Sequence, residues 1–212
     1  MKTDDLIKAL AADASAPAMP MGRAWSLAAG AAIVIAAAVF LATIGPRPDI
    51  AAAADTVRFL FKPVVAIVLA VTAFMTLSAL SRPAADDGPA IFSLVAVPLL
   101  LLAAVALELA AIPPDQWSGR LIGTNAVVCL TCIPLIGIGP LAAFLFVLRH
   151  GAPTRPALAG AVAGLLAGGI AATFYAMHCT DDSPLFVATW YTIAVAGLAA
   201  LGALAGPRVA RW

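Results

Sequence analysis

Charged residues are scarce in this sequence. Of its 212 residues, 11% are Asp, Glu, Lys or Arg, whereas soluble domains carry about 25%. Hydrophobic residues make up 63%, and the net charge is only +1. The small net charge provides no basic surface for a nucleic-acid partner. These shortages exclude an ordinary soluble domain and indicate an integral membrane protein.

Cysteine and histidine are also few. The three cysteines are Cys129, Cys132 and Cys179, and the two histidines are His150 and His178. A quinone-linked thiol oxidoreductase usually needs two dithiol pairs, which three cysteines do not supply. The histidines are predicted on opposite sides of the membrane, so they cannot share a haem iron. No resident cofactor is therefore predicted.

Long apolar runs rich in Ala and Gly dominate what is present. They favour helices over a β-barrel, whose strands would alternate over about 10 residues. Each run is long enough to span a bilayer, at about 20 residues. The runs lie near residues 25–45, 61–81, 90–112, 123–148, 156–177 and 185–206. The predicted fold is all-α, a bundle of six transmembrane helices over 25–206, with a cytoplasmic segment at 1–24 and a short tail at 207–212.

The distribution of Lys and Arg between the loops predicts the orientation. Eight of them fall on the side of the two termini: Lys2, Lys8, Arg23, Arg82, Arg149, Arg155, Arg208 and Arg211. Four fall on the other side: Arg47, Arg58, Lys62 and Arg120. Both termini are therefore expected in the cytoplasm. Cys179 then faces outward, into the periplasm if the source is a bacterium.

The N-terminal segment contains a short amphipathic pattern. Leu6, Ile7 and Leu10 share one face of the helix predicted for MKTDDLIKALAAD. A helix this short is marginal alone in water, so its apolar stripe needs a partner. Two interpretations remain open: a tail that lies on the lipid headgroups, and an element that docks on a cytoplasmic protein.

The outer loops hold the residues that suggest chemistry. The fourth and fifth runs are consecutive and antiparallel, so Cys129 and Cys179 can meet at the outer end, whereas Cys132 lies one turn deeper. Close to Cys179 in the chain are the auxiliary candidates, His178, Asp181 and Asp182. Thiolate and imidazole suit soft or borderline metals such as zinc, copper or cadmium, and a protonated histidine can lower a thiol pKa. The alternative is that the cysteines are ordinary small buried residues.

The fifth run carries Gly160, Gly164 and Gly168 at intervals of four. This spacing predicts a small-residue face on which another helix can approach closely. The alternative is that small residues are simply common in an Ala-rich chain.

Two features of the remaining loops bear on function. Arg58 and Lys62 are expected to mark the edge of the bilayer. Glu108 lies about one turn inside the third run, and an intramembrane acid is by default a functional candidate. A small transporter or membrane thiol oxidoreductase, using Glu108 or the cysteines, is therefore the alternative function.

Three stretches resemble the NrsF-type anti-sigma factors. They are the opening MKTDDLIKALAADA, the turn LRHGAPTRPALAGAVAGLLAG, and YAMHCTDDSPLFVATWY. The resemblance implies a six-span protein of the bacterial inner membrane, not an enzyme. It implies a partner, an extracytoplasmic-function (ECF) sigma factor, which is held inactive and released under stress, notably from heavy metals.

The resemblance also implies roles for individual residues. Cys129 and Cys179 match the family's two periplasmic cysteines, through VVCLTCIPL and MHC, and become a sensor of soft metal or oxidation. Cys132 stands where no signature cysteine is expected. The Leu6–Leu10 face becomes the sigma-binding element, and the glycine-faced helix becomes the transmitter between the two ends.

Overall fold

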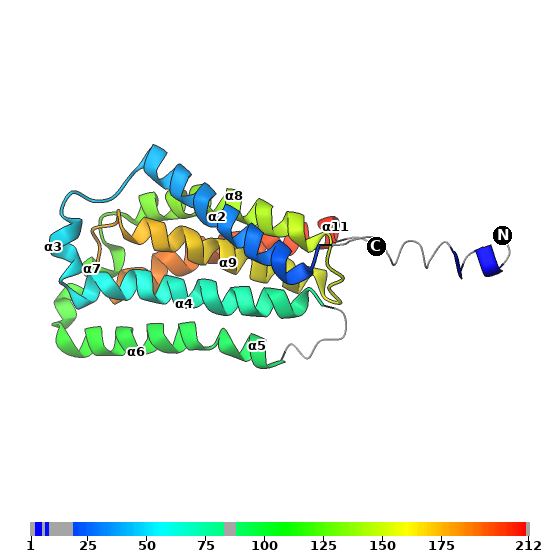
Figure 1. The fold of residues 1–212 in the computed structure, drawn as a ribbon. Helices are drawn as coiled ribbons and strands as arrows, with labels where there is room; N and C mark the ends of the chain where they lie inside the picture. The colour runs from blue at the N-terminus through cyan, green and yellow to red at the C-terminus, as the bar shows by residue number, and fades with distance from the viewer. Residues whose placement is uncertain (1–2, 6, 9–18, 83–87, 211–212) are drawn as a thin grey trace.

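The computed structural model describes residues 3–5, 7–8, 19–82 and 88–210, and within these ranges all regular secondary structure is helical. Six helical segments of the described chain are long and apolar enough to cross a membrane. They pack side by side as a bundle (Figure 1). The predicted all-α fold is confirmed, and six helices of the described chain have the length and composition of membrane spans.

The main helices follow one another in chain order. They are α2 (Met21–Thr43), α4 (Val57–Leu80), α5 (Gly88–Ser93), α6 (Ala96–Ala111), α8 (Ala126–Leu148), α9 (Pro156–Ala176) and α11 (Thr192–Val209). Shorter elements are α3 (Ile50–Ala54), η1 (Pro114–Gln116), α7 (Trp117–Ile122), α10 (Pro184–Phe186) and the π-helical turn η2 (Val187–Tyr191).

Several boundaries differ from those expected from hydropathy. Helix α2 begins at Met21 and α4 at Val57, each four residues earlier than predicted, because a helix continues beyond its apolar core. The third run is interrupted between α5 and α6. Pro98 lies in the first turn of α6, where a residue without a backbone N–H is tolerated. Because Pro98 has no N–H to donate to the carbonyl four residues earlier, it does not support a continuous helix from α5 into α6.

Helix α9 is the centre of the bundle. Most of its residues are buried, and it packs against α2, α4, α8 and α11. A Cβ added to Gly160 would lie 2.1 Å from the carbonyl oxygen of Gly202, and one added to Gly164 would lie 2.2 Å from that of Leu198. The backbones of α9 and α11 are therefore in direct contact at Gly160 and Gly164, while at Gly168 the side chain of Val195 takes the space.

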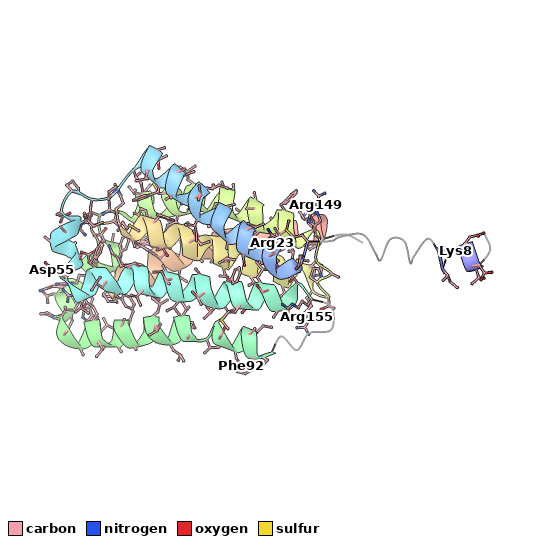
Figure 2. All side chains as sticks on the ribbon, viewed as in Figure 1. Lys8, Arg23, Asp55, Phe92, Arg149 and Arg155 are labelled. Atoms are coloured by element: carbon pink, nitrogen blue, oxygen red, sulfur yellow. The ribbon has the colours of Figure 1, made fainter. Side chains whose placement is uncertain are left out.

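The two ends of the bundle differ in content. The end that carries residues 44–56, 112–125 and 177–183 is called the cysteine end, and the opposite end the terminal end. Figure 2 shows Arg23, Arg149 and Arg155 at the terminal end and Asp55 at the cysteine end. The start of α2 and the end of α11 also lie at the terminal end (Figure 1).

A polar contact connects two helices at the terminal end. The indole Nε1 of Trp25, which is 1% exposed, donates to the hydroxyl of Ser81 over 3.0 Å. Trp25 lies in the first turns of α2, and Ser81 follows the last residue of α4. The beginning of α2 is therefore fixed to the end of α4.

The predicted sigma-binding face falls largely outside the described residues. Leu6 and Leu10 are not described, whereas Ile7 lies in a helical stretch and is 58% exposed.

Candidate functional site

A loop at residues 177–183, the cysteine loop, connects α9 to α10 at the cysteine end. The backbone N–H of Arg47 donates to the carbonyl of Met177 over 3.0 Å. The imidazole Nδ1 of His178 lies 2.9 Å from the carbonyl oxygen of Gly45. Because a carbonyl can only accept, this nitrogen must carry the hydrogen. The first loop of the chain therefore holds one side of the cysteine loop.

Lys62 lies beneath the same loop and is completely buried. Its ammonium donates to the carbonyl oxygen of Cys179 over 2.6 Å and forms an ion pair with Asp182 at 2.5 Å. A buried charge is stable only where it is paired and hydrogen-bonded. The position of Cys179 therefore depends on a cation supplied by α4.

Arg47 extends this ion pair into a chain of charges. Its guanidinium contacts Asp182 at 3.1 Å and donates to the Cys179 carbonyl over 3.4 Å. Its other nitrogens meet the two oxygens of Asp49, each at 2.7 Å. The hydrogen bond with Asp49 is the largest effect that raises the pKa of Arg47, and it lowers the pKa of Asp49. The ionic cluster Asp49–Arg47–Asp182–Lys62 thus bridges two loops and a helix.

Asp181 fixes the other side of the cysteine loop to the start of α8. Its carboxylate accepts from the backbone N–H groups of Thr124 at 3.0 Å and Asn125 at 2.8 Å. A carboxylate here caps free N–H groups and complements the helix dipole. Gly123 has φ +59°, and a Cβ on it would lie 2.8 Å from the Asp181 carboxyl carbon. Glycine is thus required for this close approach.

The two thiols named from the sequence are both fully buried. Cys129 lies in the first turns of α8 and Cys179 in the loop. The Asn125 carbonyl accepts from the N–H of Cys129 over 2.8 Å and from the hydroxyl of Tyr175 over 3.5 Å, and the N–H of Cys179 donates to the Tyr175 carbonyl over 3.0 Å, so both cysteines lie at the cysteine end. The rings of Tyr175 and Tyr191, with centroids 5.5 Å apart, lie beside Cys179. Cys132, one turn further along α8, is only partly buried. All three cysteines are free thiols.

The environment of Cys179 favours the protonated thiol. Burial raises the pKa of Cys179, and the nearby Lys62 ammonium offsets only part of this effect. His178 is directed at the Gly45 carbonyl, so its contact with the loop is structural. Within the described chain, no three His, Cys, Asp or Glu side chains are grouped to hold a metal ion. Asp181 and Asp182 are engaged by Asn125, Lys62 and Arg47 as described above.

Glu108, the other acid considered from the sequence, is buried in a second cluster. Arg58 contacts it at 2.9 Å and Arg120 at 3.2 Å, and the hydroxyl of Ser183 donates to it over 3.3 Å. The carboxylate is therefore saturated by two cations. It connects α4, α6, α7 and the start of α10.

Sequence reasoning missed the role of Lys62. It was expected to mark the bilayer edge, but the structure buries it because α4 begins at Val57 and places it a turn inside the helix. One signal was available: Lys62 follows Phe59, Leu60 and Phe61, so it is an ionisable residue within an apolar run. Nothing in the sequence marked Arg47 as its companion.

Comparison with known proteins identifies the family. A profile described as "Negative regulator of sigma F" (NrsF) matches residues 10–212. The chain is 36% identical to the anti-sigma-F factor NrsF of Caulobacter vibrioides and 34% identical to a probable anti-sigma-F factor NrsF of Azospira oryzae, each over the full length of both chains. No solved structure matches the chain. The chain, with its six apolar helices, therefore belongs to the NrsF family of negative regulators of sigma F.

Proposed function

We propose that this protein is an anti-sigma factor of the bacterial inner membrane, which binds an ECF sigma factor at its cytoplasmic face. The sigma factor is released when Cys129 and Cys179 bind a soft metal or become oxidised. The observation that carries the proposal is the position of Cys179. It is buried near Cys129, in a loop that is bonded to α4 through Lys62.

The distribution of charge supports the orientation. Arg23, Arg149 and Arg155 lie at the terminal end (Figure 2), and the positive-inside rule assigns that end to the cytoplasm. The cysteine end then faces the periplasm, where thiols meet oxidants and incoming metals. Helix α2, which follows the N-terminal segment in the chain, begins at this proposed cytoplasmic end, where a sigma factor would be held.

The chemistry of a buried thiol pair favours a soft divalent cation. Each thiol releases its proton to the surrounding water and the two thiolates bind the ion, so the buried unit remains neutral overall. Soft cations prefer thiolate ligands, and Lys62 stabilises the thiolate of Cys179. In oxidation, the two thiols instead transfer two electrons and two protons to a disulfide or peroxide, and an S–S bond joins them.

Helix α4 is the proposed route from the cysteines to the sigma factor. Lys62, near its start, donates to the Cys179 carbonyl, and Ser81, just after its end, accepts from Trp25 in α2. A cation that draws Cys179 toward Cys129 moves the carbonyl away from Lys62. The resulting displacement of α4 then reaches the first turns of α2, which continue from the N-terminal segment.

The thiols are tested by serine substitution. Cys129→Ser or Cys179→Ser should abolish the release of the bound sigma factor by Cd²⁺ in reconstituted vesicles, because one thiolate cannot close the pair. Cys132→Ser is the matched control and should respond like the wild type. If all three variants release the sigma factor at wild-type Cd²⁺ concentrations, the sensor assignment is wrong.

The N-terminal segment is tested by truncation. Removal of residues 1–16, which include Leu6, Ile7 and Leu10, should free the sigma factor without any signal. A pull-down with the full chain and with the truncated chain measures this directly. Equal recovery of the sigma factor with both chains would exclude the segment as the binding element.

A further inference from the structure

Helices α5 and α6 form an arm along the outside of the bundle (Figure 1). Among the described residues of α6, only Glu108 is buried. The arm is attached at both ends: the hydroxyl of Thr76 donates to the carbonyl of Ala90 over 2.8 Å, and Arg58 contacts Glu108 at 2.9 Å. Between these two attachments, α6 packs only loosely on α4.

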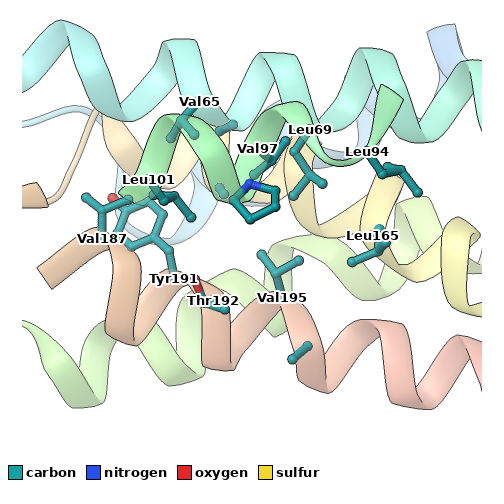
Figure 3. Close-up of a pocket in the computed structure, with 14 residues that line it drawn as sticks. Val65, Leu69, Leu94, Val97, Leu101, Leu165, Val187, Tyr191, Thr192 and Val195 are labelled. Atoms are coloured by element: carbon teal, nitrogen blue, oxygen red, sulfur yellow. The ribbon is translucent and has the colours of Figure 1, made fainter. Parts of the chain in front are cut away.

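An apolar pocket of about 260 Å³ lies behind the middle of the arm. Side chains of α4, α6 and α11 point into it, among them Leu69, Leu101 and Val195 (Figure 3). Pro98 and Ala196, at its rim, are exposed, so the pocket opens sideways between α6 and α11. An empty apolar space of this size is unfavourable in a packed protein, and acyl chains are the material available at this depth of a membrane.

A cationic cluster lies directly above the pocket. Val65 follows Arg58 by seven residues on α4, and Leu101 precedes Glu108 by seven on α6, so each pair shares a helix face. Two turns of helix separate the pocket from the cluster, roughly 10 Å. This separation suits one molecule with a polar head at the cluster and an apolar chain in the pocket.

The cluster has positive charge and hydrogen-bond donors to spare. Arg58 and Arg120 share the single carboxylate of Glu108, which leaves a net charge of one positive unit. Their side chains are 45% and 33% exposed, so further N–H groups face outward. Guanidinium groups are well suited to phosphate.

We propose that this site binds a phospholipid from the leaflet at the cysteine end. Its phosphate contacts Arg58 and Arg120, and one acyl chain fills the pocket behind α6. The lipid then completes the packing of the arm, which the protein itself leaves open. The inference does not depend on the proposed sensing by the cysteines.

The test uses the full chain, stripped of lipid by detergent washing and then incubated with phosphatidylglycerol. Native mass spectrometry should show a single retained phospholipid. Ala196→Phe places a ring at the pocket mouth and should reduce retention roughly tenfold. Leu201→Phe is the control: Leu201 is exposed, does not line the pocket and lies on a different face of the same helix from Ala196, so this variant should retain lipid normally.

A second arm separates the head from the chain. Arg58→Gln with Arg120→Gln should lose phospholipid, whereas Arg149→Gln at the terminal end should not. An excess of inorganic phosphate, or of a fatty acid without a phosphate, should not displace the bound lipid. Equal retention by the wild type and Ala196→Phe would overturn the proposal, and so would complete displacement by inorganic phosphate, which would make the cluster a simple phosphate site.

Discussion

The ion pair between Lys62 and Asp182 permits a quantitative prediction. Asp182→Asn would leave the fully buried Lys62 ammonium with the Cys179 carbonyl and the ring of Phe59, but without a negatively charged partner among the described residues. Breaking a buried pair in this way costs about 3–5 kcal/mol of unfolding free energy. Lys62→Met should cost less, about 1–3 kcal/mol, because Asp182 keeps Arg47 and is 24% exposed.

The double variant provides the decisive comparison. When Lys62→Met is added to Asp182→Asn, no buried charge remains unpaired, so the double variant should be more stable than Asp182→Asn alone. Unfolding by SDS in mixed micelles, followed by circular dichroism at pH 7, measures all four proteins. Asp49→Asn is the control: Asp49 is 58% exposed, and its loss should change stability little.

The same variants bear on release of the sigma factor. Moving a complex from mostly bound to mostly free requires about 5.5 kcal/mol. If the Lys62–Asp182 pair is present in the holding state and absent in the released state, its loss supplies about 3–5 kcal/mol of this amount. Asp182→Asn should therefore release the sigma factor without metal.

Strictly additive effects of Lys62→Met and Asp182→Asn on the free energy of unfolding would refute the reasoning, because they would show that Lys62 and Asp182 do not interact.

Two further predictions concern packing and pH. Gly164→Ala should destabilise the bundle by about 1–3 kcal/mol, since the new Cβ would meet the Leu198 carbonyl. Gly197→Ala is the control: it has open space around it and should be neutral or slightly stabilising. Similar losses of stability for both variants would contradict the assigned backbone contact. Because burial raises the pKa of Cys179, the folded state holds this proton more tightly than the unfolded state. The contribution of this group to the free energy of unfolding is therefore fully present below the ordinary thiol pKa of about 8.5 and falls as the pH rises above it. Denaturation measured between pH 7 and 10 should show this loss of stability in the wild type and a smaller loss in Cys179→Ser.

The sequence was sufficient to predict the helices and to place Cys129 and Cys179 at the same end of the bundle. Span length follows from apolar length, and consecutive antiparallel helices bring the start of α8 next to the end of α9. The glycine register also indicated which face of α9 permits close approach, and Gly160 and Gly164 lie against α11.

The polar contacts that hold the cysteine loop could not be predicted in the same way. Lys62 and Cys179 are separated by 117 positions in the chain, and a cation near the end of an apolar run is equally typical of a bilayer edge. Hydropathy also does not identify the central helix, because the peripheral span of α5 and α6 has a mean hydropathy of 2.7 whereas the span of the enclosed α9 has 1.8. Tertiary packing alone determines which helix is enclosed.

The two polar contacts of α4 have a thermodynamic consequence. If cation binding at Cys129 and Cys179 weakens the hold on the sigma factor by some factor, a bound sigma factor must weaken cation binding by that same factor. The protein in complex with its sigma factor would thus be a less sensitive metal detector than the free protein. Cells that contain more sigma factor would need more metal to respond, so the ratio of the two proteins would set the metal concentration at which release occurs. Helix α4, which contacts both Trp25 and Cys179, would be the element through which each site affects the other.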